Sequence, residues 1–229
     1  MRLLLASTLA LAAAACTDFA TPQQLESATI IAVVADPPLV APGDQARLTI
    51  VVADQTGVLT LPPATWQLGE AFPGVAPMGT VTGDATGATY TAPATVPPRP
   101  DSVPPLDSIE VSVETPDGPR TAIKAMPVVP GAAANPAITA LAVGADDAMA
   151  GTVIVAKGDT RMLSVTTDPP MDAETTRYAW YTSVGTIKYY QSNPCELVVD
   201  QDAASGPLIV VVRDGVGGVV WRSVTLQVE

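Results

Sequence analysis

The sequence contains no histidine and only two cysteines, Cys16 and Cys195, among its 229 residues. Without histidine there is no Ser/His/Asp triad, no Cys/His dyad and no His-ligated zinc or copper site. Aromatic residues make up only 4% of the chain, although hydrophobic residues make up 48%. The apolar content is therefore mostly alanine and valine, which suits short β-strands better than long amphipathic helices. These absences remove a large fraction of enzyme classes and favour an all-β fold.

Basic residues are also scarce: 11 lysines and arginines stand against 23 acidic residues, for a net charge of −12. Such a charge argues against nucleic acid and anionic lipid as partners. The 23 prolines and 17 glycines are spread along the chain, which fits many short elements joined by turns. Because the runs between them are apolar and β-branched, the composition indicates a folded chain rather than a disordered one.

The N-terminus has the layout of a secretory signal, with Arg2 followed by an apolar run that ends at Cys16. This run is too short for a permanent transmembrane helix, which needs about 20 residues. The segment Ala13-Ala14-Ala15-Cys16 resembles a bacterial lipobox, whose cysteine receives diacylglycerol and becomes the new N-terminus. The resemblance implies a signal peptide over residues 1–15, a lipidated tether over residues 16–26 and a stable membrane anchor.

The lipobox resemblance departs from the strongest form of the motif at Ala13, where leucine is usual. An ordinary cleaved signal that leaves Cys16 as an incidental thiol is the alternative. Thr17 follows the cysteine in place of aspartate. By resemblance to Gram-negative lipoproteins, this implies localisation to the outer membrane of the cell envelope, either periplasmic or surface-exposed.

The second cysteine, Cys195, has no intramolecular partner if Cys16 is acylated. It begins the strand-like run from Cys195 to Val199 and is predicted to be a small buried hydrophobe. A reactive thiol is the alternative, although no nearby cation or base in the sequence would lower its pKa.

A pattern of turn and strand occurs twice, at an offset of about 115 residues. Residues 41–50 (APGDQARLTI) and 156–165 (AKGDTRMLSV) each join an Ala-x-Gly-Asp turn to an alternating strand. Trp66 follows the first copy and Trp180 follows the second at a similar distance. The offset is a domain length, so the chain is predicted to contain two copies of one fold.

The predicted domains cover residues 27–127 and 137–229, with a short, stiff, Pro- and Ala-rich linker at residues 128–136. Short alternating strands, frequent turns and a tryptophan on a central strand are typical of an immunoglobulin-like sandwich. Four segments resemble the bacterial Ig-like domains found in tandem on envelope proteins: Trp66-Gln67-Leu68, Thr89-Tyr90-Thr91-Ala92-Pro93, Tyr178-Ala179-Trp180-Tyr181 and Val211-Val212-Arg213-Asp214-Gly215. The resemblance implies two all-β domains after a lipoprotein signal peptide, and it carries no catalytic residues.

Acidic residues gather in three predicted turn regions, namely Asp146-Asp147, Asp168 with Asp172 and Glu174, and Asp200 with Asp202. Loops of this kind hold calcium between some tandem β-sandwich domains. No Asp-x-Asp-x-Asp-Gly loop is present, so neither a metal nor another cofactor is predicted and calcium is left as an alternative. Paired carboxylates for glycoside hydrolysis would need a cleft that a sandwich of this size does not promise.

A Pro-rich insertion over residues 93–105 has no counterpart in the second copy. It is interpreted as an extended connection that resists edge pairing and proteolysis. The alternative is a polyproline segment offered to a partner.

Strand alternation places Tyr178 and Trp180 in the core of the second domain and turns Tyr181 outward, and Trp66 is expected in the first core. The run 208–212 is apolar on both faces, which is typical of a strand covered on both sides. The last strand places Trp221 outward as well. Tyr181, an aliphatic pair and Trp221 are therefore predicted to form an exposed interaction patch. The alternative is that the chain itself covers the patch, with residues 187–190 or with the first domain.

These observations predict a non-enzymatic envelope lipoprotein that acts as a structural, adhesion or interaction module with a protein or glycan partner. The alternative is a spacer or accessory subunit of a carbohydrate-active or other envelope enzyme complex. The chain ends at Glu229, directly after the last predicted strand, so no fused catalytic domain is expected.

Overall fold

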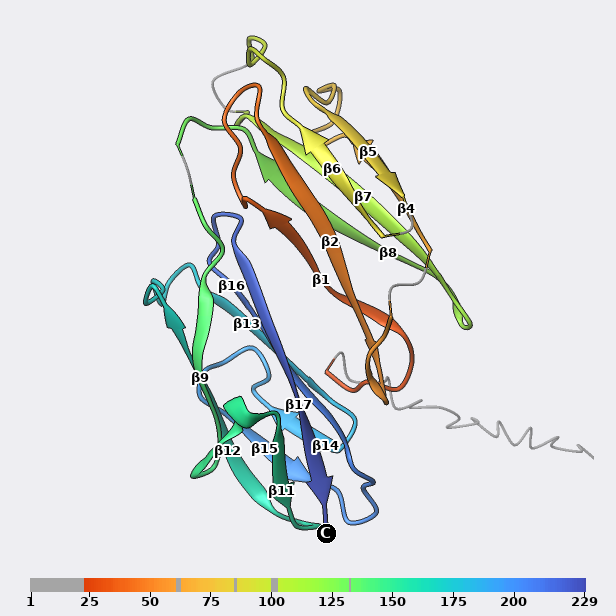
Figure 1. Cartoon of the computed structure of the whole chain (residues 1–229), viewed down its shortest axis with the longest axis vertical. Coiled ribbons are helices and arrows are strands. Elements are labelled where there is room, and N and C mark those ends of the chain that lie inside the picture. The colour runs from red at the N-terminus through yellow and green to blue at the C-terminus, as the bar shows by residue number, and fades with distance from the viewer. Residues whose placement is uncertain (1–22, 61–62, 85, 100–102, 132) are drawn as a thin grey trace, which may run out of the picture.

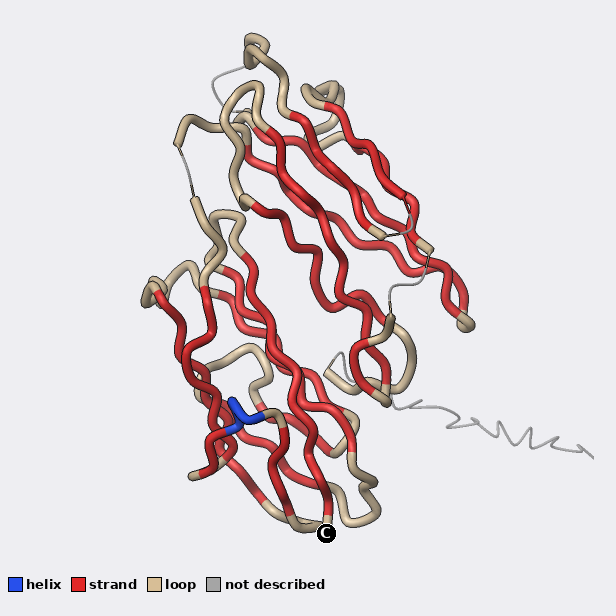
Figure 2. The backbone as a smooth tube through the Cα atoms, in the orientation of Figure 1, coloured by secondary structure: helices blue, strands red, loops and turns tan. Residues whose placement is uncertain are grey.

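The computed structural model describes residues 23–60, 63–84, 86–99, 103–131 and 133–229. The predicted signal peptide and Cys16 lie outside the described residues. The described chain forms two β-sandwiches that overlap along part of their length (Figure 1). Strands dominate both, and the one helix within the described ranges is the single 3-10 turn η1 (Ala148–Ala150; Figure 2). No helix in this part of the chain is long and apolar enough to cross a bilayer.

The first domain contains eight strands arranged in two facing sheets. The strands are β1 (Thr29–Asp36), β2 (Gln45–Asp54), β3 (Gly57–Val58), β4 (Ala64–Gly69), β5 (Thr80–Asp84), β6 (Gly87–Thr91), β7 (Leu106–Thr115) and β8 (Gly118–Pro127). One sheet has the order β1-β2-β6-β5 with β3 against β2, and the other has the order β4-β7-β8. Val40, after β1, forms a parallel bridge with Val128, after β8. Lettered along the chain without β3, the sheets are ABED and CFG, the arrangement of an immunoglobulin constant-type domain.

The second domain repeats this arrangement. Its strands are β9 (Ala137–Val143), β10 (Asp146–Asp147), β11 (Thr152–Val155), β12 (Thr160–Asp168), β13 (Arg177–Thr182), β14 (Gly185–Lys188), β15 (Cys195–Val199), β16 (Gly206–Arg213) and β17 (Val219–Val228). The sheets have the orders β10-β9-β12-β15-β14 and β11-β17-β16-β13, and β11 pairs in parallel with β17. The chain is therefore two tandem Ig-like β-sandwiches, and the predicted fold class is confirmed.

The repeated Ala-x-Gly-Asp turn leads into β2 in the first domain and into β12, the corresponding strand, in the second. Gly43 and Gly158 have left-handed φ angles of +88° and +76°, a conformation that only glycine adopts without steric cost. The turns lead into β2 and β12, where Ala46, Leu48 and Leu163 point into the cores. The sequence repeat thus corresponds to one structural position in the two domains.

The tryptophans of the two domains occupy different environments. Trp180 is 0% exposed at the centre of the second core, and its Nε1–H donates to the carbonyl of Ser192 at 3.0 Å. Trp66 is only partly buried, and its buried Nε1 has no hydrogen-bond partner. Its ring lies so close to Gly83 that a Cβ there would be 2.6 Å from Trp66 Cδ1. Tyr90, 0% exposed, fills the centre of the first core instead.

Candidate functional site

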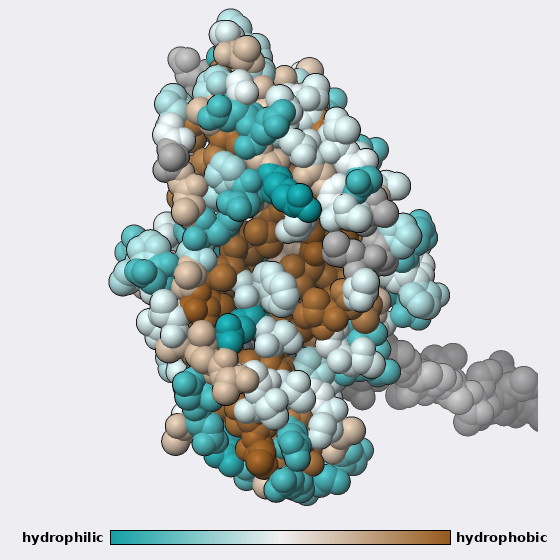
Figure 3. Space-filling view, viewed as in Figure 1, coloured by the Kyte–Doolittle hydropathy of each residue, from teal (hydrophilic) through white to brown (hydrophobic). Residues whose placement is uncertain are grey.

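The first domain covers the outer face of the second domain's β13-β16-β17 sheet. On that face, buried apolar residues form one cluster with residues of β1, β2 and the segment before β1. The cluster contains Leu25, Ile31, Ala32, Val51, Ala53, Ala179, Ile209, Val211 and Val219. Tyr181 and Trp221 are partly buried against it. Apolar residues are visible across the middle of the molecule, where the two domains meet (Figure 3).

The prediction of an exposed patch at Tyr181 and Trp221 is therefore corrected in favour of its alternative, in which the first domain covers the patch. The physical reason is that the first domain offers a matching surface. In β2, four consecutive residues, from Ile50 to Ala53, are buried, so this strand is apolar on both faces like β16. When β2 and β16, each apolar on both faces, pack together, their outward apolar side chains are removed from water.

Hydrogen bonds between the domains surround the apolar cluster. Each uses a side-chain donor on one domain and a backbone carbonyl on the other. The bonds are Arg213 Nη2 to the oxygen of Ile31 (2.9 Å), Ser183 Oγ to the oxygen of Gln55 (3.1 Å) and Lys124 Nζ to the oxygen of Gly217. Because these bonds need defined backbone positions, they fix the orientation in which the apolar faces meet.

Asn135, in the predicted linker, ties the linker to both domains. Its side-chain Nδ2 donates to the carbonyl of Ala35 at 2.7 Å, and its Oδ1 accepts from the backbone N–H of Val219 at 2.9 Å. One amide therefore bridges the end of β1 and the start of β17. Its two contacts hold this part of the linker against the junction.

The segment before β1 also joins the two domains. Leu25 N donates to the carbonyl of Thr182 at 3.0 Å, and Thr182 N donates to the carbonyl of Gln23 at 3.0 Å. Leu25 is 1% exposed and belongs to the interdomain cluster. Residues 23–26 were predicted as part of a tether, but the burial of Leu25 places them in the junction, along strand β13 of the second domain.

The Lys124 ammonium is buried at the junction. Burial lowers its pKa to about 8, with the Asp214 carboxylate opposing the shift and Arg213 adding to it. Lys124 is 7% exposed, and its Nζ hydrogen bond goes to a neutral carbonyl. The charged form therefore costs free energy in the folded state.

The stability of the protein should depend on pH through this lysine. The unfolded chain keeps a lysine pKa near 10.4, so between about pH 8 and pH 10 it binds more protons than the folded chain. Stability from this group consequently rises with pH across that window. In urea unfolding, we expect the difference in unfolding free energy between the wild type and Lys124→Met to shift in favour of the wild type from pH 7 to pH 10. A difference that stays constant with pH would contradict this assignment.

Cys195 is 2% exposed within the second core. Burial raises the pKa of its thiol to about 12, so the thiol stays protonated and unreactive at neutral pH. Its surroundings are those of a small core hydrophobe, and the described residues supply no disulfide partner.

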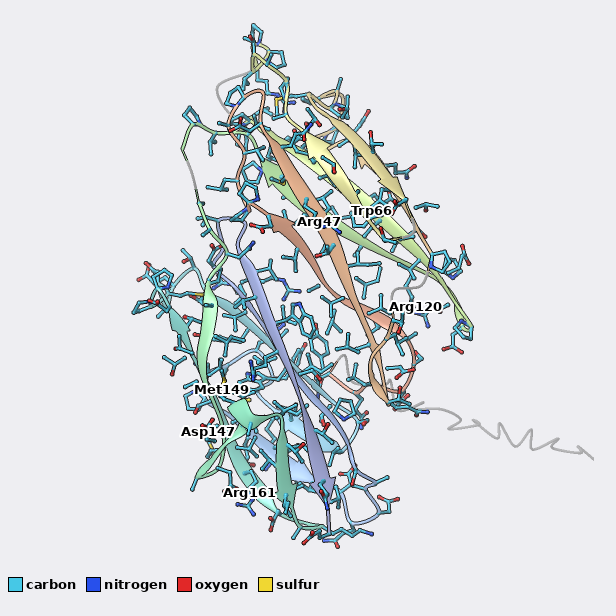
Figure 4. The ribbon with its side chains drawn as sticks, viewed as in Figure 1. Arg47, Trp66, Arg120, Asp147, Met149 and Arg161 are labelled. Carbon is cyan, nitrogen blue, oxygen red and sulfur yellow. The ribbon has the colours of Figure 1, made fainter. Side chains whose placement is uncertain are left out.

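Several acidic residues in turns of the second domain use their carboxylates locally. Asp159 pairs with Arg161 at 2.7 Å, and this hydrogen bond lowers the pKa of the Asp159 carboxyl. Asp147 and Asp172 accept backbone N–H groups of their own turns, at 2.8 Å from Met149 and 2.6 Å from Glu174. Figure 4 shows Asp147 beside Met149, with Arg161 further along the same domain. Among the described residues, no group of three or more acidic or cysteine side chains could hold a metal ion.

The described part of the Pro-rich insertion is anchored by a buried charge. Arg99 turns inward, and its Nη2 lies 3.8 Å from Asp107 Oδ1. Asp107 is 1% exposed, which makes this a buried carboxylate with several donors around it. The donors are Tyr90 OH (2.8 Å), Met78 N (2.9 Å) and Gly79 N (2.7 Å). Arg99 Nη2 also donates to the carbonyl of Ala76 at 3.2 Å, so this part of the insertion is held to β7 and to the loop before β5.

No protein-family model and no curated protein sequence matches the chain. Among solved structures, it is similar to a chimeric titin Z1Z2-Z1Z2 tandem, with 15% identity, a TM-score of 0.33 and coverage of 88% of this chain and 99% of that chain. It is also similar to the N-terminal Ig1-2 module of the Drosophila receptor protein tyrosine phosphatase DLAR, with 16% identity, a TM-score of 0.33 and coverage of 89% and 100%.

A nucleoside hydrolase-related hypothetical protein from Saccharophagus degradans is similar over 43% of this chain and 26% of that chain, with 16% identity and a TM-score of 0.32. Likenesses at these TM-scores carry no argument about function. The assignment of the fold rests on the strand order of the two domains.

Proposed function

We propose that this chain is a non-enzymatic lipoprotein of the bacterial cell envelope, anchored through Cys16, whose two Ig-like domains act as one rigid interaction module. The lipoprotein part of the proposal rests on the lipobox-like segment that ends at Cys16, and the rigid module rests on the apolar cluster between the domains. Tandem domains that move independently meet through small, polar contacts. Here Leu25, Ile209 and Val211 are at most 1% exposed at the contact between the domains.

A rigid pair of domains suits a protein that presents surfaces at a fixed angle to a partner. Ordering the two domains before binding lowers the entropic cost of binding through both of them. The interdomain hydrogen bonds of Arg213, Lys124 and Asn135 support the same role, because they fix the orientation of one domain relative to the other.

The anchor proposed at Cys16 would bring the junction close to the membrane. Only six residues separate Cys16 from Gln23, which pairs with the second domain. An extended chain of that length spans roughly 25 Å at most. A lipid on Cys16 would therefore hold the junction, rather than the far end of either domain, near the bilayer.

The proposed anchor is tested by replacing each cysteine in turn. In the full chain expressed in a Gram-negative host, Cys16→Ser should move the protein from the membrane pellet to the soluble envelope fraction and abolish labelling by a clickable palmitate analogue. Acylation requires that thiol, and the acyl chains supply the membrane affinity. Fractionation after a high-salt wash and in-gel detection of the label measure the two effects.

The matched control is Cys195→Ser, which removes the other cysteine. Because Cys195 is buried in the second core, this variant should remain in the pellet and keep its label. If Cys16→Ser still sediments with membranes, or still carries the label, the proposed anchor is wrong.

A further inference from the structure

A groove on the second domain combines tyrosines with arginines. It has a volume of about 490 Å³ and is lined by Tyr178, Tyr181, Tyr190, Arg177, Arg213 and Gln191. The groove lies along β13, the last strand in the order β11-β17-β16-β13. Tyr190 is fixed beside this strand because its carbonyl accepts from Trp180 N at 3.0 Å. The lining belongs entirely to the second domain, at the margin of the interdomain cluster.

The two arginines of the groove, Arg177 and Arg213, lie side by side although their positive charges repel each other. Arg177 on β13 and Arg213 on β16 are direct partners in the antiparallel ladder, so their side chains share one face. Like charges at such a position destabilise a sheet. The chain has 23 acidic residues, yet the ion pairs found among the described residues involve only Arg99, Arg161 and Lys188 as cations.

Neutral acceptors hold both guanidinium groups without cancelling their charge. Arg177 Nη1 donates to the carbonyls of Glu174 (2.8 Å) and Thr176 (2.9 Å). Arg213 donates through Nη2 to the carbonyl of Ile31 at 2.9 Å. A guanidinium has five N–H donors, so Arg177 keeps Nε and Nη2 for a bidentate contact with an anion.

The tyrosines add a second, independent feature. Burial raises the pKa of Tyr181, so its hydroxyl stays protonated beside Arg213. Tyr189, next in sequence to Tyr190, is 78% exposed and has a φ of +57°, an uncommon backbone conformation for a residue other than glycine. Strained backbone of this kind gathers at ligand-binding sites. Four of the five tyrosines of the chain lie in or next to this one groove.

We propose that this groove binds a carboxylated saccharide, with the sugar carboxylate paired to Arg177 and Arg213 and the sugar ring against Tyr181 and Tyr190. Arginine is suited to planar, bidentate recognition of carboxylates. Tyrosine offers an apolar face for the C–H surface of a pyranose and a hydroxyl for its polar edge. The volume lies within the usual range for small-molecule sites and suits one or two sugar units better than an extended peptide.

This inference names the partner of the interaction module, so it rests on the proposed function. The two are tested separately because binding in solution requires no membrane anchor. Failure of saccharide binding leaves the fractionation result for Cys16→Ser intact, and failure of the anchor leaves binding by the purified chain intact.

The test uses the full-length protein in detergent and isothermal titration calorimetry with trigalacturonate. Saturable binding is expected, weakening as salt screens the ion pairs. Arg177→Gln should weaken it at least tenfold, because a bidentate contact is lost, and Tyr190→Ala should also weaken it. The matched control is Arg47→Gln, which removes the same charge from an exposed position on the first domain (Figure 4) and should leave binding unchanged.

Three further ligands test whether binding requires a carboxylate carried by a saccharide. Maltotriose lacks the carboxylate, glucose 6-phosphate replaces it with phosphate, and tetraglutamate carries carboxylates on a peptide; each should bind at least tenfold more weakly than trigalacturonate. Equal or tighter binding of any of them would overturn the proposal, as would an Arg177→Gln variant that binds like Arg47→Gln. Arg177→Gln relieves a like-charge contact but also removes two hydrogen bonds to backbone carbonyls, so its thermal unfolding is measured beside that of the wild type. A cooperative transition well above the titration temperature separates lost binding from lost folding.

Discussion

Replacing Trp180 with alanine is expected to lower the free energy of unfolding by about 3 to 5 kcal/mol. The indole is 0% exposed, contacts both sheets of the second core and donates its N–H to the carbonyl of Ser192. The variant leaves a large cavity and an acceptor without its donor. Urea unfolding monitored by far-UV circular dichroism measures the loss.

Trp66→Ala is the matched comparison, with the same substitution on the corresponding strand of the first domain. Its cost should be smaller, about 1 to 2 kcal/mol, because Trp66 is partly exposed and its Nε1 has no partner to lose. If Trp180→Ala costs less than about 1 kcal/mol, or no more than Trp66→Ala, the ranking of the two tryptophans is wrong.

The contrast between the tryptophans shows how far the sequence alone reaches. The Ala-x-Gly-Asp repeat and the strand alternation predict two domains of one fold, because glycine turns and period-two burial are local properties of the chain. How deeply a side chain is buried depends on which residues of the facing sheet pack against it. Gly83 beneath Trp66 and Tyr90 at the centre of the first core are contacts of that kind.

The contact between the domains is another feature that the sequence predicts only in part. Alternation in the run 208–212 correctly predicts that apolar side chains point outward from the second domain, but it does not identify what covers them. The complementary signal is the apolar run from Ile50 to Ala53 in β2, which lies in the other domain. Leu25 gives no periodic signal because it lies outside every regular strand.

The tyrosine–arginine groove was also beyond prediction from the sequence. Arg177 and Arg213 become neighbours only through the pairing register of β13 and β16. Tyr190 reaches them from the turn between β14 and β15. Strands β13 and β16 are separated in sequence by β14 and β15, so their pairing register is set only in the folded sheet. No local pattern in the sequence predicts it.

Placing a charge in the interdomain core is expected to separate the two domains while each stays folded. Ile209 is 0% exposed on the outer face of β16, so Ile209→Asp would bury an unpaired carboxylate against β1 and β2. The cost of about 3 kcal/mol or more is avoided if the faces part and water reaches the aspartate. We expect a larger radius of gyration in small-angle X-ray scattering and faster proteolysis in residues 128–136, with far-UV circular dichroism unchanged.

The matched control for the separation of the domains is Ile123→Asp, which makes the same substitution at a side chain that is 71% exposed on β8. It should leave the radius of gyration and the rate of linker cleavage as in the wild type, because its carboxylate remains in water. A wild-type radius and cleavage rate in Ile209→Asp would mean that the apolar cluster does not hold the domains together. Loss of all β-type circular dichroism in that variant would mean instead that neither domain stays folded once their contact is broken. In both outcomes the comparison with Ile123→Asp isolates burial as the cause, since the chemical change is identical.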